Sequence, residues 1–99
     1  MDISTEAFEN GRKEERFTII DVREQLEYHS FNLGGINIPL GRLAAAIEEE
    51  EFDKDDAIVV LCQRGLRSKT AAQMLVAAGY TRVQNLAGGL LAWNKKYHE

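Results

Sequence analysis

Residues 58–79 constrain the fold of this chain more than any other stretch. They begin with four apolar residues, Ile-Val-Val-Leu at 58–61, a run of the length typical of a buried strand. Cys62 follows directly, then a loop that contains Gly65, and then apolar residues at helical spacing up to Gly79, a typical residue just after a helix. The stretch therefore predicts a strand, a short loop and a helix, with the cysteine at the carboxyl end of the strand.

This arrangement suits a reactive thiol. The backbone N–H groups of residues 63–68 can converge on one point, and the start of the helix, where Ser68 is the expected N-cap, adds partial positive charge. Such a site binds an anion and lowers the pKa of a thiol, which makes the thiolate a nucleophile. Cys62 could instead be an ordinary buried cysteine. Its position beside Arg64 and Arg67, which suit an anionic ligand, favours the nucleophile.

Strands and helices are expected to alternate along the rest of the chain. Further strands are predicted at Ile3 and at residues 17–22, 36–38 and 83–86. Helices are predicted at residues 5–10, 23–30 and 42–50, and again after Gly88-Gly89. The alternation indicates a single α/β domain over residues 1–99, with a parallel sheet between helices and a ligand site beyond the carboxyl ends of the strands.

Several side chains mark the ends and the inner faces of these helices. Ser4 is expected to cap the first helix and Gly11 to end it. In the second helix, Leu26 is expected to face the core. In the last helix the same is expected of Leu90, Leu91, Trp93 and Tyr97.

Four motifs, in order, resemble those of single-domain rhodaneses, the thiosulfate sulfurtransferase family. They are Ile-Asp-Val-Arg at 20–23, Gly-Ile-Asn-Ile-Pro-Leu at 35–40, Cys-Gln-Arg-Gly-Leu-Arg-Ser at 62–68, and Asn-Leu-Ala-Gly-Gly at 85–89 followed by Ala92-Trp93. The resemblance implies a three-layer α/β/α sandwich whose five-stranded parallel sheet has the order 1-5-4-2-3. Many members carry Gly-His-Ile before the third strand, whereas this chain has Asn32-Leu33-Gly34, so no role of that histidine is carried over.

The resemblance also implies a chemistry. Cys62 would take a sulfane sulfur from thiosulfate or a related small anion, hold it as a persulfide, and pass it to cyanide, a thiol or a protein acceptor. No cofactor or metal is needed. The substrate-binding residues would be those of the loop: Gln63, Arg64, Gly65, Leu66, Arg67 and Ser68. Arg67 is the expected contact for the anionic group, with Arg64 as the alternative.

Other polar residues are expected to be structural. Asp21 and Arg23, at the carboxyl end of a strand, are interpreted as an ion pair or loop brace. His29 and His98 lie in polar surroundings and are not expected to act as a general base.

Composition limits the class of protein, its partners and its cellular compartment. A hydrophobic content of 44% with 28% charged residues is typical of a soluble globular protein, and a net charge of −4 argues against nucleic acid or an anionic membrane as partner. One cysteine allows no internal disulfide, which fits a reducing compartment. No apolar run has membrane-spanning length, so a cytoplasmic location is expected.

Two other functions stay open. The chain could be a sulfur-carrier or docking module that turns over little by itself. It could also be a cysteine-dependent phosphatase or arsenate reductase, but related enzymes of that kind place five residues between cysteine and arginine, whereas four separate Cys62 from Arg67 here. The shorter loop favours sulfur over phosphate.

Overall fold

The computed structural model describes residues 1–98, and a parallel sheet lies at its centre. The strands are β1 (Asp2–Ile3), β2 (Thr18–Asp21), β3 (Ile36–Asn37), β4 (Ile58–Leu61) and β5 (Val83–Leu86). They lie in the order β1-β5-β4-β2-β3, and every neighbouring pair is parallel. The strand order implied by the family resemblance is therefore confirmed.

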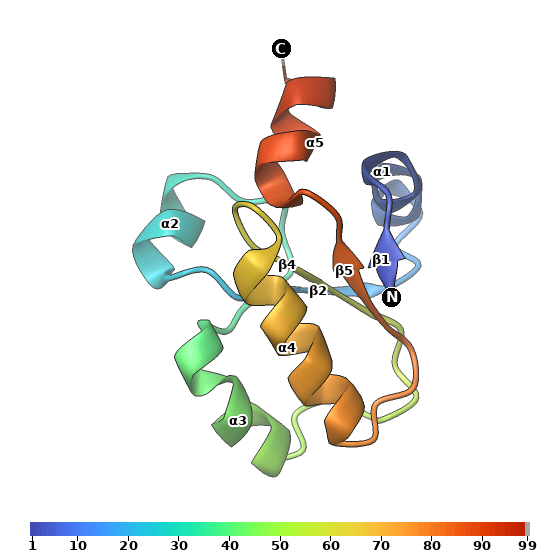
Figure 1. Ribbon diagram of the computed structural model, residues 1–99, viewed down its shortest axis with the longest axis vertical. Helices are drawn as coiled ribbons and strands as arrows, with labels where there is room; N and C mark the ends of the chain where they lie inside the picture. Colours follow the sequence, from blue (N-terminus) through green and yellow to red (C-terminus); the bar gives the residue numbers. More distant parts are fainter. Residues whose placement is uncertain (99) are drawn as a thin grey trace.

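Helices cover both faces of this sheet. They are α1 (Thr5–Lys13), α2 (Gln25–Ser30), α3 (Leu40–Glu48), α4 (Leu66–Ala77) and α5 (Gly89–Tyr97). One buried cluster joins α3 and α4 to one face, and a second joins α1 and α5 to the other (Figure 1). The three-layer α/β/α sandwich is thus confirmed. No helix within residues 1–98 is long and apolar enough to cross a membrane.

The central strand β4 explains why its sequence is apolar without alternation. All four of its residues are buried. Ile58 and Val60 belong to the cluster under α3 and α4, whereas Val59 and Leu61 belong to the cluster under α1 and α5. Both faces of a parallel strand are covered, so burial of each of these side chains stabilises the fold by about 1.5–3 kcal/mol. β4 therefore fixes the position at which Cys62 leaves the sheet.

The first helix is longer than expected. Ser4 is its N-cap, as predicted, and accepts a hydrogen bond from the Ala7 N–H at 3.1 Å. Gly11 does not end the helix, which continues to Lys13. Gly11 is buried under Phe17, and a Cβ added there would lie 2.4 Å from the Phe17 ring. Glycine is required at this position by packing, so its use as a stop signal was wrong.

The second and third helices also differ at their ends. α2 begins at Gln25 instead of residue 23, and Leu26, expected in the core, is 83% exposed. α2 buries none of its residues, because it lies over the carboxyl edge of the sheet and not on a face. α3 begins at Leu40, two residues before the predicted start and directly after Pro39, which is its N-cap.

The last helix turns fewer side chains inward than expected. Leu90 and Trp93 are buried, but Leu91 and Tyr97 are each 39% exposed. A single helix packed on one side buries one stripe, and these two residues lie beside it. The expectation for Leu91 and Tyr97 was therefore wrong.

Candidate active site

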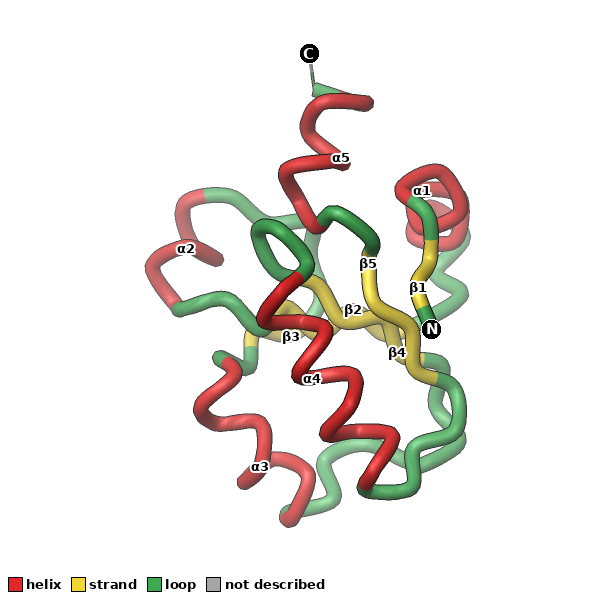
Figure 2. The backbone as a smooth tube through the Cα atoms, viewed as in Figure 1, coloured by secondary structure: helices red, strands yellow, loops and turns green. Residues whose placement is uncertain are grey.

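The loop after β4 rises between α2 and the start of α5, beyond the carboxyl end of the central strand (Figure 2). Cys62 is the first residue of this loop and is only 1% exposed. Its Sγ accepts hydrogen bonds from the N–H groups of Gly65 at 3.1 Å and Ser68 at 3.3 Å. The Ser68 hydroxyl also lies 3.3 Å from Sγ. The sulfur is thus surrounded by donors.

These donors change the acidity of the thiol. Burial raises the pKa of Cys62, but the Ser68 hydroxyl and the N–H groups of Ser68, Gly65 and Arg64 together lower it by more. The pKa of Cys62 therefore lies below its ordinary value. The consequence is a larger fraction of nucleophilic thiolate near neutral pH.

Glycine at position 65 starts the helix that follows. Gly65 is the N-cap of α4 with a φ of 90°, a left-handed conformation that side chains disfavour. The prediction of Ser68 as N-cap was wrong, because the helix already begins at Leu66. Ser68 lies in the first turn of α4, fully buried, where its side chain reaches the sulfur.

Ser68 also contacts a residue that sequence reasoning did not assign to the site. Its hydroxyl donates a 2.5 Å hydrogen bond to the Asn85 side-chain oxygen. Asn85 belongs to β5 and is 5% exposed. A polar residue in a strand whose neighbours Val83 and Leu86 are buried was the available signal.

The start of α5 holds the loop from the other side. The Leu90 and Leu91 N–H groups donate to the carbonyl oxygens of Cys62 and Gln63, each at 2.9 Å. The turn before them packs tightly, since a Cβ on Gly89 would lie 2.5 Å from the Cys62 oxygen. The loop around the Cys62 sulfur, called the cradle below, is therefore held between the first residues of α4 and the first residues of α5.

Arg67 is paired with an acidic residue of α2. Its guanidinium donates to both carboxylate oxygens of Glu27, at 2.7 and 3.0 Å. The pair holds the pKa of Glu27 at about 2 and raises that of Arg67. No local pattern links the two residues, which lie 40 positions apart. Glu27 was therefore not predicted as a site residue from the sequence.

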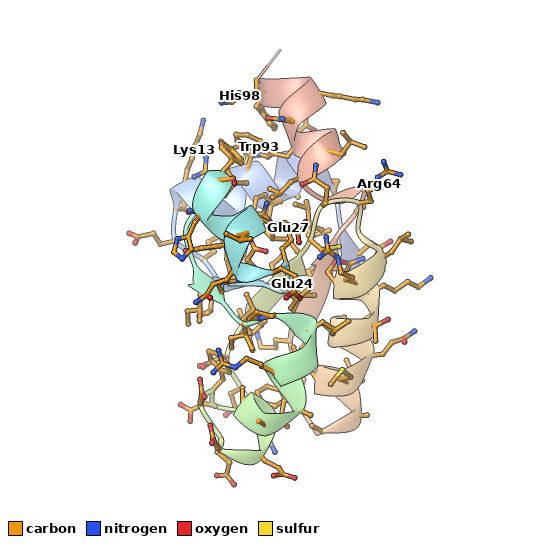
Figure 3. The ribbon with its side chains drawn as sticks, turned by 90° about the vertical axis from the view of Figure 1, so that its left-hand side faces the viewer. Lys13, Glu24, Glu27, Arg64, Trp93 and His98 are labelled. Atoms are coloured by element: carbon orange, nitrogen blue, oxygen red, sulfur yellow. The ribbon has the colours of Figure 1, made fainter. Side chains whose placement is uncertain are left out.

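Arg64 has different surroundings. Its side chain is exposed and points away from the body of the molecule, whereas Glu27 lies on α2 near the loop (Figure 3). Within residues 1–98 the Arg64 side chain has no ion pair or hydrogen bond. Of the loop residues, Gln63 is half-buried and Leu66 is 73% exposed.

A pocket of about 280 Å³ opens over the sulfur. The residues that line it are Glu27, Cys62, Gln63, Arg64, Leu66 and Arg67. Gly65 and Ser68 do not line it and contact Cys62 from within the loop. The structure thus brings every predicted loop residue to one place, which can hold a small anion beside a thiolate.

The Asp21–Arg23 pair is a brace, as interpreted from the sequence. Arg23 donates to Asp21 at 2.7 Å in a buried ion pair. It also donates to the backbone oxygens of Glu27 and Phe31, at 3.2 and 2.7 Å. Arg23 therefore ties the middle and the C-cap of α2 to the end of β2 and helps to position Glu27.

Both histidines lie outside the pocket. His29 is exposed at the end of α2, and His98 packs against the rings of Phe31 and Trp93. Neither lines the pocket that contains Cys62.

Comparison with known proteins shows what this architecture is. Residues 4–96 match the family model described as the rhodanese-like domain. The chain is 34% identical over 97 residues to the putative sulfur carrier protein YrkF of Bacillus subtilis, covering 96% of this chain but 51% of YrkF. It is 42% identical over 72 residues to the thiosulfate sulfurtransferase PspE of Escherichia coli, covering 72% of this chain and 68% of PspE.

A solved structure is similar throughout. The human single-domain sulfurtransferase TSTD1 superposes with a TM-score of 0.87 at 26% identity, covering 96% of each chain. The chain spans only about half the length of YrkF, so that likeness concerns one part of the relative. Sheet order, cysteine loop and family match agree, and the chain belongs to the rhodanese-like family, which includes proteins named as sulfurtransferases.

Proposed function

We propose that this chain is a sulfurtransferase that carries sulfane sulfur as a persulfide on Cys62. The observation that supports this most is the sulfur itself: a single, buried cysteine whose Sγ accepts N–H donors from Gly65 and Ser68. Relatives named as thiosulfate sulfurtransferases support the same chemistry.

The first half-reaction loads the enzyme. The Cys62 thiolate attacks the outer sulfur of thiosulfate and forms a new S–S bond. The bond between the two sulfur atoms of thiosulfate breaks, and sulfite leaves with the electron pair. The terminal persulfide sulfur then carries a negative charge, which the N–H groups of the loop stabilise.

The second half-reaction removes the terminal sulfur from the Cys62 persulfide. A thiolate or cyanide attacks the terminal sulfur, the S–S bond to Cys62 breaks, and the Cys62 thiolate is restored as the leaving group. Neither step needs a metal, a cofactor or a general base, because the thiolate is already the nucleophile.

The loop and its charges define the substrate class. The pocket of about 280 Å³ accepts a small anion, with Arg64 and Arg67 at its wall as donors for sulfonate oxygens. Gln63 and Leu66 complete the wall, while Gly65 and Ser68 shape the cradle beneath. A small anionic sulfur donor is therefore the proposed substrate.

A second candidate function is a sulfur carrier that receives its sulfur from, or delivers it to, another protein. The name of YrkF as a putative sulfur carrier favours it, and the 73% exposed Leu66 beside Cys62 offers a protein an apolar contact. Both functions use the same persulfide on Cys62. The enzyme would turn over small substrates by itself, whereas the carrier would turn over little without its partner protein.

Mass spectrometry tests the persulfide directly. Incubation with thiosulfate should add one sulfur atom that dithiothreitol removes, and Cys62→Ser should gain none because the chain has one cysteine. Cyanide should then release thiocyanate from the loaded protein. Wild-type protein left unmodified by thiosulfate and by other sulfane donors would contradict the proposal.

A further inference from the structure

The Ser68 hydroxyl has one proton and two neighbours that can use it. Its oxygen lies 2.5 Å from the Asn85 side-chain oxygen and 3.3 Å from Cys62 Sγ. An amide oxygen only accepts hydrogen bonds, so Ser68 must be the donor in the contact with Asn85. The Cys62 thiol can then donate its own proton to the Ser68 oxygen. This arrangement satisfies all three side chains while Cys62 is protonated.

Ionisation of Cys62 breaks this pattern. A thiolate has no proton to donate and accepts hydrogen bonds only. The Ser68 hydroxyl must therefore rotate toward Sγ to stabilise it, and the Asn85 oxygen loses its donor. Asn85 is 5% exposed, so solvent replaces that donor poorly. Forming the thiolate thus costs one buried hydrogen bond.

The Asn85 amide cannot turn round to remove this cost. Its nitrogen faces two groups that only accept, the Asp2 carboxylate and the Gly65 carbonyl oxygen, each at 3.4 Å. A rotation by half a turn would place the amide oxygen against both of them. Asp2 and Gly65 therefore fix the Asn85 oxygen toward Ser68.

We propose that Asn85 is a positioning residue that competes with the Cys62 sulfur for the Ser68 hydroxyl proton and so limits how much of the resting enzyme is thiolate. The inference rests on the proposed role of Cys62 as the nucleophile. Asn85 does not line the pocket. Its side-chain oxygen reaches Cys62 only through Ser68, whereas its nitrogen donates to the Gly65 carbonyl oxygen of the loop.

The charged groups around Cys62 are the same in the variants that test this. They are Arg64 in the loop, Arg67 on α4 with its partner Glu27 on α2, the Asp21–Arg23 pair at the end of β2, and Asp2 on β1. Substitution of Asn85 changes no charge. A shift in the acidity of Cys62 would therefore come from hydrogen bonding.

The test is the pH profile of Cys62 alkylation by iodoacetamide, measured in variants without any sulfur donor. Asn85→Val should move the midpoint down by about half to one pH unit, because the freed hydroxyl donates to the thiolate. Ser68→Ala should move it up, and the double variant should match Ser68→Ala. Gln84→Val, a similar change at the exposed neighbouring position, should leave it unchanged.

Asn85→Ala provides a smaller substitution with the same expected direction if valine disturbs the strand. An unchanged or raised midpoint in the folded Asn85 variants would overturn the inference, as would a double variant that behaves like Asn85→Val. These shifts are independent of turnover. Protein that shows them but accepts no sulfur would contradict the proposed function and leave this inference standing.

Discussion

The two arginines of the loop place their charge in different surroundings. Arg67 is held by Glu27 at two nitrogens, so its remaining N–H groups are already ordered beside the pocket. Arg64 is exposed, and binding an anion would require ordering its whole side chain. A residue that is already ordered loses less entropy on binding, which favours Arg67 as the principal contact for the donor.

Arg67→Ala is expected to lower kcat/KM for thiosulfate about ten- to a hundred-fold, since a charge-assisted hydrogen bond contributes about 1.5–3 kcal/mol. Arg64→Ala is expected to have a smaller effect. Steady-state kinetics with cyanide as acceptor measures both. A larger loss in Arg64→Ala would show that the free arginine binds the donor and that Arg67 serves mainly to hold α2.

At the scale of elements, α2 depends on its polar contacts. It buries none of its residues, and it is tied to the molecule by Arg23 at its backbone and by the Glu27–Arg67 pair, which joins it to α4. The wall of the pocket that α2 supplies therefore depends on one ion pair and on hydrogen bonds to its backbone, and not on a buried core.

The Glu27–Arg67 pair should make the free energy of unfolding fall at low pH. The pKa of Glu27 is lowered from 4.5 to about 2, so the pair stabilises the fold fully above about pH 4.5 and its contribution is lost as the pH falls toward 2. Because both side chains are 36% exposed, we expect less than about 1 kcal/mol. Urea unfolding at neutral pH and near pH 3 should show a smaller difference in Glu27→Gln than in wild type.

The matched control is Glu48→Gln, which removes the same charge at the exposed end of α3. Its acid dependence should follow the wild type. Equal acid dependence in the Glu27→Gln and wild-type proteins would show that solvent screens the pair completely.

The length of the loop between β4 and α4 is expected to favour sulfur over phosphorus chemistry. With four residues between Cys62 and Arg67, the N–H groups of Gly65 and Ser68 point at the sulfur atom itself, and we expect the short loop to fit phosphate oxygens poorly. Wild-type protein should turn over thiosulfate and leave p-nitrophenyl phosphate untouched. A glycine inserted between Gly65 and Leu66 should reduce sulfur transfer, because it moves the Gly65 N–H away from that of Ser68. Phosphatase turnover by the wild type that requires Cys62 would contradict this account.

Much of the fold follows from local pattern, and the exceptions have physical causes. The run at 58–61 predicts β4 because a strand covered on both faces must be apolar throughout. Gly11 and Leu26 were misread because the glycine serves packing and the leucine belongs to a helix that lies over the edge of the sheet and buries none of its residues. The Glu27–Arg67 and Ser68–Asn85 contacts join residues distant in sequence, so no local pattern predicts them.

At the scale of the whole molecule, the site is held by both ends of the chain. β1 supplies Asp2 beside Asn85, and α5 supplies the N–H groups of Leu90 and Leu91 to the loop carbonyls. The loop itself contains few buried apolar side chains. Its shape therefore depends on segments that are far from it in sequence.

Gly89→Ala should disturb the contact between the start of α5 and the Cys62 loop. Gly89 has a φ of 64°, and a Cβ there would lie 2.5 Å from the Cys62 oxygen. We expect a loss of about 1–3 kcal/mol in the free energy of unfolding and a marked slowing of persulfide formation. Gly41→Ala is the control, since its Cβ would meet no atom within 4 Å and its φ is not left-handed. Wild-type rates of persulfide formation in Gly89→Ala would show that the loop keeps its shape without α5.

The contact between α5 and the Cys62 loop also has a consequence for biosynthesis. A ribosome makes β4, the loop and α4 well before residues 89–91, so the nascent chain contains the cysteine without the donors for the Cys62 and Gln63 carbonyls. Until α5 emerges and docks, the loop lacks these two restraints and the thiol lacks its finished surroundings. On the proposed function, Cys62 would therefore reach its final geometry for sulfur loading only after α5 has been synthesised and has docked.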